Sequence, residues 1–235
     1  MNYNWAVTLV LALAAILSVA SRKLDALAGL TGFLTALLIY AGAGNAGILS
    51  LAAFFVLATI ATSLGLRKKQ KLGTVEKNKG KRTSGQVLAN AGVAAICGVL
   101  MIVLPRFREL LQLMLVASLA SATADTLSSE LGNIYGRNYY NILTGKPDQQ
   151  GLDGVVSLEG TVIGIAGAFF IALLHAATRG SLNYIVVVVV AGAAGNVVDS
   201  VLGASLERKH FIGNNVVNFL NTAAGAITAA ILYFL

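Results

Sequence analysis

Charged residues are scarce in this sequence. Asp, Glu, Lys and Arg make up 11% of its 235 residues, whereas a soluble domain carries roughly 25%. There is one cysteine, Cys97, so a disulfide framework is excluded. There are only two prolines, while the 25 glycines suit helices that pack closely in a membrane. Because hydrophobic residues make up 57% of the chain, we expect an integral membrane protein.

The apolar segments are about long enough to cross the hydrocarbon core, which takes roughly 20 helical residues. They are residues 5–20, 25–42, 46–65, 86–104, 110–131, 157–177, 182–204 and 214–235. No basic region precedes the first segment, so we expect a retained helix rather than a signal peptide. The prediction is a single all-α domain over residues 1–235, a polytopic bundle of about eight transmembrane helices.

Basic residues divide unevenly between the two sides of this predicted bundle. If the loop 66–85 is cytoplasmic, 14 of the 17 Lys and Arg residues fall on its side, and only Arg106, Arg108 and Arg179 fall on the other. The positive-inside rule therefore predicts a multi-pass protein of the cell membrane with cytoplasmic loops at 66–85 and 132–156 and both termini outside. The net charge of +7 indicates anionic lipids or a phosphorylated substrate as partners rather than nucleic acid.

Three acidic residues lie inside or at the edge of the spans: Asp125, Glu130 and Asp199. A charge there costs several kcal/mol unless it is paired or hydrated, so such residues are candidates for function. Asn and Ser singly often only hold membrane helices together. Here, however, polar residues of five helices converge at one predicted depth, together with Glu159. The Asn and Ser residues among them are candidates for nucleotide or phosphate binding: Asn90, Ser121, Ser129, Asn196, Asn214, Asn215, Asn218 and Asn221.

The basic segment 73–85 lies on the same predicted face. Positive charge alone would fit an ordinary membrane anchor. Its glycines and hydroxyls also fit a phosphate cradle, although the Walker A spacing is missing. Its candidate nucleotide- or phosphate-binding residues are Glu76, Lys77, Asn78, Lys79, Gly80, Lys81, Arg82, Thr83 and Ser84.

Carboxylate and amide oxygens suit Mg²⁺, which usually bridges to substrate phosphates, and Lys and Arg suit phosphate oxygens. We therefore expect Mg²⁺-dependent phosphoryl or nucleotidyl transfer at the cytoplasmic interface, from a nucleoside triphosphate to a lipid. The predicted Mg²⁺ ligands are Asp125, Glu130, Glu159 and Asp199. The predicted catalytic residues are Asp125, Glu130, Asp199 and Lys81. Small-residue helix faces suit packing within the bundle or between protomers, which leaves a homo-oligomer open.

Five ordered segments resemble an integral membrane family called domain of unknown function 92. They are 80–92 (GKRTSGQVLANAG), 121–132 (SATADTLSSELG), 153–161 (DGVVSLEGT), 195–204 (GNVVDSVLGA) and 214–222 (NNVVNFLNT). The family includes the chloroplast phytyl-phosphate kinase and bacterial and archaeal relatives, and the loop 132–156 is its variable part. The resemblance implies phosphoryl transfer from CTP, or else ATP, to an isoprenoid monophosphate such as phytyl or geranylgeranyl phosphate.

Other functions fit the same residues. A polyprenol kinase or a CDP-lipid-type cytidylyltransferase would use the same metal and phosphate chemistry on a different acceptor or bond. A cation- or proton-coupled transporter would place Asp125 and Asp199 in an ion path, but transporter sites lie near the bilayer midplane and these acids cluster toward one interface.

Overall fold

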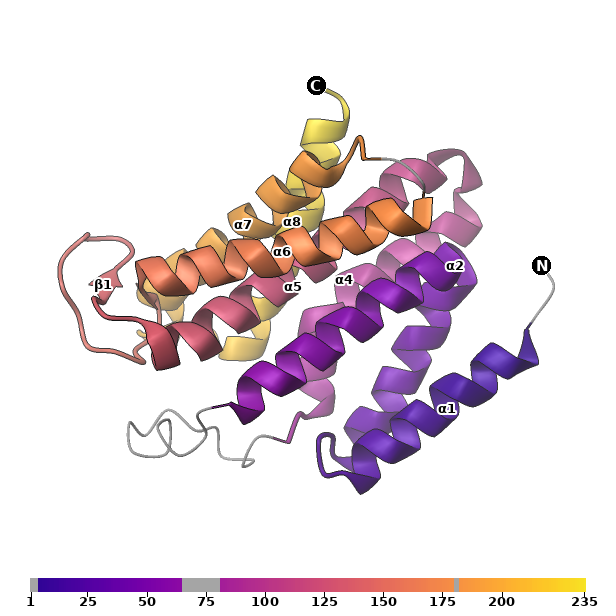
Figure 1. Ribbon diagram of the computed structural model, residues 1–235, viewed down its shortest axis with the longest axis horizontal. Helices are drawn as coiled ribbons and strands as arrows, with labels where there is room; N and C mark the ends of the chain where they lie inside the picture. The colour runs from indigo at the N-terminus through magenta and orange to yellow at the C-terminus, as the bar shows by residue number, and fades with distance from the viewer. Residues whose placement is uncertain (1–3, 65–80, 180–181) are drawn as a thin grey trace.

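The computed structural model describes residues 4–64, 81–179 and 182–235, and these fold almost entirely into helices (Figure 1). The α-helices are α1 (Trp5–Ala20), α2 (Ala26–Ser63), α4 (Ser84–Val103), α5 (Arg108–Tyr135), α6 (Leu158–Arg179), α7 (Ile185–Leu202) and α8 (Asn214–Tyr233). A 3₁₀ turn, η1 (Pro105–Phe107), precedes α5, and a π-helical turn, η2 (Gly203–Glu207), follows α7. The prediction of an all-α polytopic membrane protein is confirmed.

Among the described residues, six helices are long and apolar enough to cross a membrane. The sixteen-residue α1 is apolar but shorter. The long helix α2 is interrupted at Gly44, whose φ of 64° and ψ of −150° are not helical, and its two arms fold back on each other in Figure 1. The count of about eight spans is reached only if both arms and α1 are included, and it stays a prediction.

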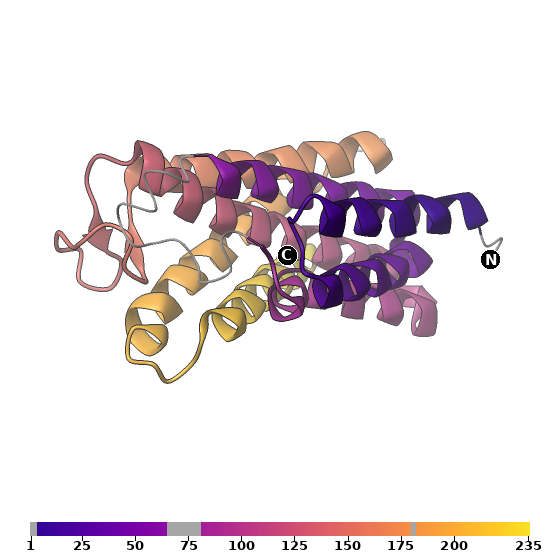
Figure 2. The same ribbon diagram turned by 90° about the horizontal axis from the view of Figure 1, so that it is seen from below.

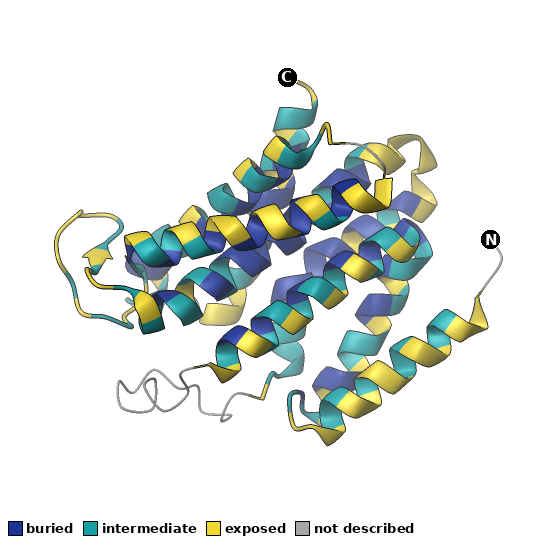
Figure 3. Ribbon diagram, in the orientation of Figure 1, coloured by how far each residue is buried: buried dark blue, intermediate teal, exposed yellow. Residues whose placement is uncertain are grey.

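Helix α5 forms the centre of the bundle. It contacts α2, α4, α6, α7 and α8, and most of its apolar length is buried. In contrast, α1 packs against α2 and buries none of its residues (Figure 3). The apolar surface that these outer helices expose fits contact with lipid rather than with water.

Glycine allows α2 and α4 to approach each other closely. A methyl group added at Gly98 would lie 2.6 Å from the carbonyl oxygen of Leu38, and one at Gly42 would overlap the backbone of Gly98. Close to this contact, the interrupted helix leaves carbonyl groups without intrahelical partners. Arg108 donates a hydrogen bond to the carbonyl oxygen of Gly42 at 2.7 Å, which satisfies one of them.

The ends of several helices gather at one end of the bundle, which we call the loop end (Figure 2). The turn after α1 meets the residues before α4 there, because the Arg82 amide donates to the carbonyl of Lys23 at 2.9 Å. The Asp25 amide in turn donates to the carbonyl of Arg82 at 3.1 Å. Residue 82, which precedes a helix, is thereby fixed to a turn far away in sequence.

The connection between α5 and α6 is an ordered part of the loop end. Helix α5 continues to Tyr135, beyond the predicted end at 131, and the two-residue strands β1 (Tyr140–Asn141) and β2 (Val155–Val156) pair antiparallel. The Tyr139 hydroxyl donates to the carbonyl oxygens at the end of α5, 2.9 Å from that of Gly136, and accepts from Gln150 at 2.7 Å. Burial, and then the negative charge of Glu159, raise the pKa of Tyr139, which therefore stays a neutral donor at physiological pH.

Arg208, just after η2, fastens this connection to the turn between α7 and α8. Its guanidinium forms an ion pair with Asp148 at 2.8 Å and donates to the carbonyl oxygen of Asp153 at 3.1 Å through Nε. The contact is close, because a methyl group at Gly154 would overlap Ala204. Gly154 has a φ of 71°, a conformation that glycine adopts without strain.

Candidate active site at the loop end of the bundle

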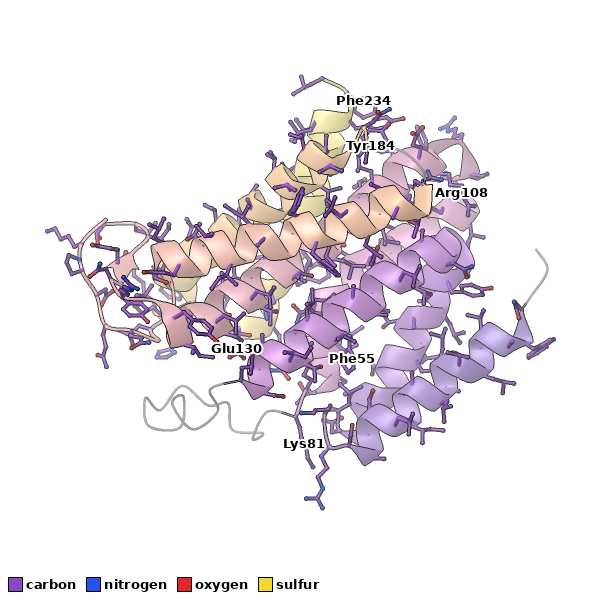
Figure 4. All side chains as sticks on the ribbon, viewed as in Figure 1. Phe55, Lys81, Arg108, Glu130, Tyr184 and Phe234 are labelled. Carbon is purple, nitrogen blue, oxygen red and sulfur yellow. The ribbon has the colours of Figure 1, made fainter. Side chains whose placement is uncertain are left out.

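A cavity of about 440 Å³ opens at the loop end, and residues from α2, α4, α5, α6, α7 and α8 line it. Nine of the residues predicted from the sequence lie in its lining: Arg82, Asn90, Asp125, Ser129, Glu130, Asn196, Asp199, Asn214 and Asn218. Figure 4 shows Glu130 and Lys81 toward this end of the molecule, and Arg108 and Tyr184 at the opposite end. The cavity therefore joins polar groups that are up to 156 positions apart, from Thr62 to Asn218.

Asp125 of α5 and Asp199 of α7 form the centre of the site. Their carboxyl groups interact directly with each other. Small residues allow this approach: a methyl group added at Gly195 would overlap the side chain of Ser121, and one at Gly192 would lie 3.3 Å from Cβ of Ala120. Two carboxylates in contact repel each other unless a proton or a cation lies between them, so the pair is suited to binding a cation.

Asn221 supports the pair from α8. Its side-chain amide donates to the Asp199 carboxylate at 3.3 Å, and its side-chain carbonyl accepts from the Ser121 hydroxyl. Ser121 and Asn221 are fully buried and are absent from the cavity lining among the described residues. Both are predicted nucleotide- or phosphate-binding residues, and this role stays a prediction. In the structure they lie beside the carboxylates but outside the lining, with Asn221 in contact with Asp199 and Ser121 in contact with Asn221.

A second network links α5 to α7. The Ser128 hydroxyl donates to the side-chain oxygen of Asn196 at 3.0 Å, and the Ser200 hydroxyl donates to the Asn196 backbone carbonyl at 3.1 Å. Ser128 and Ser200 line the cavity as well. Neither was predicted from the sequence, although Ser128 lies three positions after Asp125 and Ser200 directly follows Asp199.

Two further carboxylates in the lining were also missed as site residues, namely Asp153 and Glu207. Glu207 interacts electrostatically with Asp153 and Asp199, and the side chain of Asn214 hydrogen-bonds to it. It reaches the site because the π-helical turn η2 extends α7 to Glu207, and such turns are frequent at functional sites. The sequence placed residue 207 in a connecting loop, and Asp153 in the loop before α6.

The charge of the cavity is strongly unbalanced. Five carboxylic acids line it, namely Asp125, Glu130, Asp153, Asp199 and Glu207. In the lining that the structure describes, Arg82 is the only basic residue. Its guanidinium also lies 5.5 Å from the ring centre of Phe54. An excess of negative charge attracts cations and repels a bare triphosphate, which fits a nucleotide that arrives with a divalent metal ion.

The donor set fits Mg²⁺ in a site completed by substrate. In the described parts of the chain, no group of three or more His, Cys, Asp or Glu side chains is placed to hold a metal ion. Mg²⁺ commonly takes only one or two carboxylates and completes its shell with water and phosphate oxygens. Asp125 and Asp199 would supply two such ligands. The side-chain oxygen of Asn90 is buried in the same lining, has no hydrogen-bond partner among the described residues, and would be a further hard donor.

The other predicted residues that the structure describes are not part of the cavity lining. Thr83 caps α4 through a reciprocal pair of hydrogen bonds with Gln86, and Ser84 is the first residue of the helix. Lys81 is exposed. Asn215 packs beside Gly85, and Glu159 accepts a hydrogen bond from the Arg137 amide at 3.4 Å. The predicted residues Glu76, Lys77, Asn78, Lys79 and Gly80 lie outside the described residues.

The fold and the cavity define a polytopic membrane protein with a polar, acidic site at one end of its bundle. The sequence matches the family described as integral membrane protein DUF92 over residues 9–226, and the chain belongs to this family. The predicted family membership is therefore confirmed. No solved structure matches the chain.

Relatives occur in plants, cyanobacteria and archaea. The chain is 34% identical over 208 residues to Protein VTE6, chloroplastic, of Arabidopsis thaliana, an alignment that covers 85% of this chain and 62% of that protein. It is 34% identical to an uncharacterized membrane protein of Synechocystis, with 82% and 76% covered. It is 32% identical to one of Methanocaldococcus jannaschii, with 79% and 76% covered. The chain thus spans less than two thirds of the plant protein.

Proposed function

We propose that this protein is a membrane kinase that transfers a phosphoryl group from a nucleoside triphosphate, CTP in the first instance, to an isoprenoid monophosphate such as phytyl or geranylgeranyl phosphate. One observation carries the proposal: the paired carboxyl groups of Asp125 and Asp199 lie in an acidic cavity at the end of an apolar bundle. Such a site serves a metal–nucleotide complex on its polar side and a lipid on its apolar side. The likeness to the family that includes phytyl-phosphate kinase supports the choice of reaction.

The proposed reaction needs no general base. An oxygen of the acceptor monophosphate attacks the γ-phosphorus, and the bond between that phosphorus and the β–γ bridging oxygen breaks. The nucleoside diphosphate leaves with the bonding electron pair, and the lipid becomes a diphosphate. A phosphomonoester has a second pKa near ~6, so the acceptor is already largely dianionic at neutral pH. The protein's task is to position the two phosphates and to offset their charge.

The residues of the cavity suit this task. Asp125 and Asp199 would hold Mg²⁺, which when bound neutralises charge on the triphosphate. Asn214 and Asn218 lie side by side, with an amide-to-carbonyl hydrogen bond of 3.1 Å, and both line the cavity. Their amide groups can donate hydrogen bonds to phosphate oxygens, and the guanidinium of Arg82 can form an ion pair with the same phosphates.

Product analysis tests this proposal. Purified protein in detergent or nanodiscs is incubated with Mg²⁺, a twenty-carbon isoprenoid monophosphate, and CTP or ATP, and the products are identified by mass spectrometry. The expected products are the isoprenoid diphosphate and a nucleoside diphosphate. Release of inorganic diphosphate with a CDP-lipid would instead identify a cytidylyltransferase. If a free prenol replaces the monophosphate and only the prenol is phosphorylated, the protein is a prenol kinase. If the protein transfers no phosphoryl group but takes up cations in proteoliposomes, it is a transporter.

A further inference from the structure

The cavity at the loop end is not polar on every side. Along α6 and α7 its lining includes the apolar residues Ile165, Ala193 and Val197, next to polar residues of the same helices such as Thr161 and Asn196. Ile165 is 39% exposed and Val197 is 50% exposed, so the apolar part of the cavity opens to the outside of the bundle. Ile165 is seven positions into α6, or about 10 Å along the helix from its start, which is deep enough for contact with acyl chains.

Close packing of α6 on α7 shapes this opening into a groove. A methyl group added at Gly192 of α7 would lie 2.8 Å from Cβ of Ala168 of α6, so small residues bring the two helices close together. One turn nearer the loop end, a methyl group at Gly164 of α6 would lie 3.2 Å from the side-chain nitrogen of Asn196 of α7. Ile165 directly follows Gly164, and Val197 directly follows Asn196. Because the helices are antiparallel, one step along each turns both side chains to the same side of the contact. They therefore form the two walls of the groove, and the small side chain of Ala193 leaves room between them.

We infer that the hydrocarbon tail of the lipid acceptor lies in the groove walled by Ile165 and Val197, with its phosphate directed into the cavity toward Asp125 and Asp199. This inference rests on the proposed function and adds the path by which the acceptor enters from the membrane. The cavity of about 440 Å³ is at the small end of the ~300–1,000 Å³ range in which proteins enclose drug-sized ligands. It cannot enclose a nucleotide and a long tail together, so the tail must leave it sideways.

The structure contains a second apolar hollow, of about 480 Å³, between α1 and α2. Its lining includes Ile16, Val19, Leu30 and Phe33 and contains only apolar residues among those described. It shares no lining residue with the acidic cavity. A chain lying there would keep its phosphate away from the carboxylates. This hollow is thus the alternative that an experiment must distinguish.

Photo-crosslinking tests the position of the tail without depending on turnover. The probe is a twenty-carbon isoprenoid monophosphate with a diazirine on its tail, and the labelled peptides are mapped by mass spectrometry. We expect labels on residues 161–165 and 193–197 that excess unmodified isoprenoid monophosphate displaces. Labels on α1 and α2, or labels spread over the lipid-facing surface, would overturn the inference. If the labels map as expected but no phosphoryl transfer is found, the proposed function is wrong, while the inference that the isoprenoid tail binds in the groove is supported.

A matched pair of substitutions tests the same groove kinetically. Val197→Trp should narrow the groove. The control is Val56→Trp on α2, because Val56 is 52% exposed, close to the 50% of Val197, and does not line the cavity. The measurement is the ratio of kcat/KM for a twenty-carbon acceptor to that for a five-carbon acceptor. We expect Val197→Trp to lower this ratio by about tenfold, because the twenty-carbon tail loses apolar contacts in the groove that the five-carbon acceptor does not make.

Val56→Trp should leave the ratio of kcat/KM for the two acceptors within about twofold of that of the original protein, a much smaller change than the tenfold expected for Val197→Trp. Thermal unfolding of both variants shows whether each one is folded. An unchanged ratio in folded Val197→Trp, or an equal fall in both variants, would overturn the inference even if phosphoryl transfer itself is found.

Discussion

The side-chain amide of Asn221 donates a hydrogen bond of 3.3 Å to the carboxylate of Asp199, across the contact between α7 and α8. The same side chain accepts a hydrogen bond from Ser121 of α5. One buried amide therefore connects the three helices that position the two central carboxylates. Its role is to orient Asp199 from behind, since Asn221 is fully buried.

We predict that Asn221→Ala lowers the free energy of unfolding by about 1–3 kcal/mol, because it leaves the buried Ser121 hydroxyl without its acceptor. Activity should fall roughly 10–100-fold, as when outer partners of metal ligands are removed. The double variant with Ser121→Ala provides a thermodynamic cycle, and a coupling energy of about 0.5–3 kcal/mol is expected for residues in one network. Strictly additive effects on stability would show that the two side chains do not act together.

We predict that the connection between α5 and α6 loosens in acid. The hydrogen bond from Arg208 holds the pKa of Asp148 below its ordinary value, with smaller contributions from the Gln149 amide and the Asn141 side chain. Because the pKa of Asp148 is lower in the folded protein than in the unfolded chain, the ionised carboxylate stabilises the fold at pH values above its unfolded pKa of about 3.9. This stabilisation is lost as the pH falls through the pKa of the folded protein. Hydrogen exchange over residues 136–157, corrected for its intrinsic pH dependence, should therefore accelerate below about pH 4.

Arg208→Ala should produce the same faster exchange already at pH 7, because it removes the ion pair and the hydrogen bonds to the Asp153 carbonyl. The neighbouring exposed residue supplies a control, Lys209→Ala, for which no change is expected. Equal exchange in the two variants would mean that the Arg208 contacts do not hold the connection in place.

We predict that Gly98→Ala destabilises the protein by about 1–3 kcal/mol, because the added methyl group would meet the Leu38 carbonyl oxygen at 2.6 Å and separate α2 from α4. Gly213→Ala is the matched control, since nothing lies within 4 Å of the added group there. Thermal unfolding in one detergent compares the two. A Gly98→Ala protein as stable as Gly213→Ala would contradict the close packing of α2 on α4.

Much of the fold was predictable because membrane spans are encoded by long apolar runs. The predicted segment 5–20 corresponds to α1, 86–104 to α4 and 214–235 to α8, each within two residues at either end. The break in α2 at Gly44 falls in the short connection expected at 43–45. Hydropathy does not encode which helices touch. The central place of α5 therefore emerged only from the structure.

The site was predictable where its residues lie inside spans, since a polar group there is conspicuous. Asp125, Asp199 and Asn218 are examples, and all three line the cavity. Asp153 and Glu207 could not be selected in this way, because in a loop an acidic residue is unremarkable. Their place depends on a π-helical turn and on the contacts of Arg208. Glu159, by contrast, opens its span as predicted but lies outside the described lining.

The role of the Asp125–Asp199 pair is the central claim, and Asp199→Asn tests it most directly. The substitution keeps the shape of the side chain and removes its charge. We predict that Mg²⁺-dependent transfer from CTP to a twenty-carbon isoprenoid monophosphate falls more than about 100-fold, since even outer partners of metal ligands cost roughly 10–100-fold. The variant should unfold at a temperature close to that of the original protein. Full transfer activity in a folded Asp199→Asn protein would contradict the account.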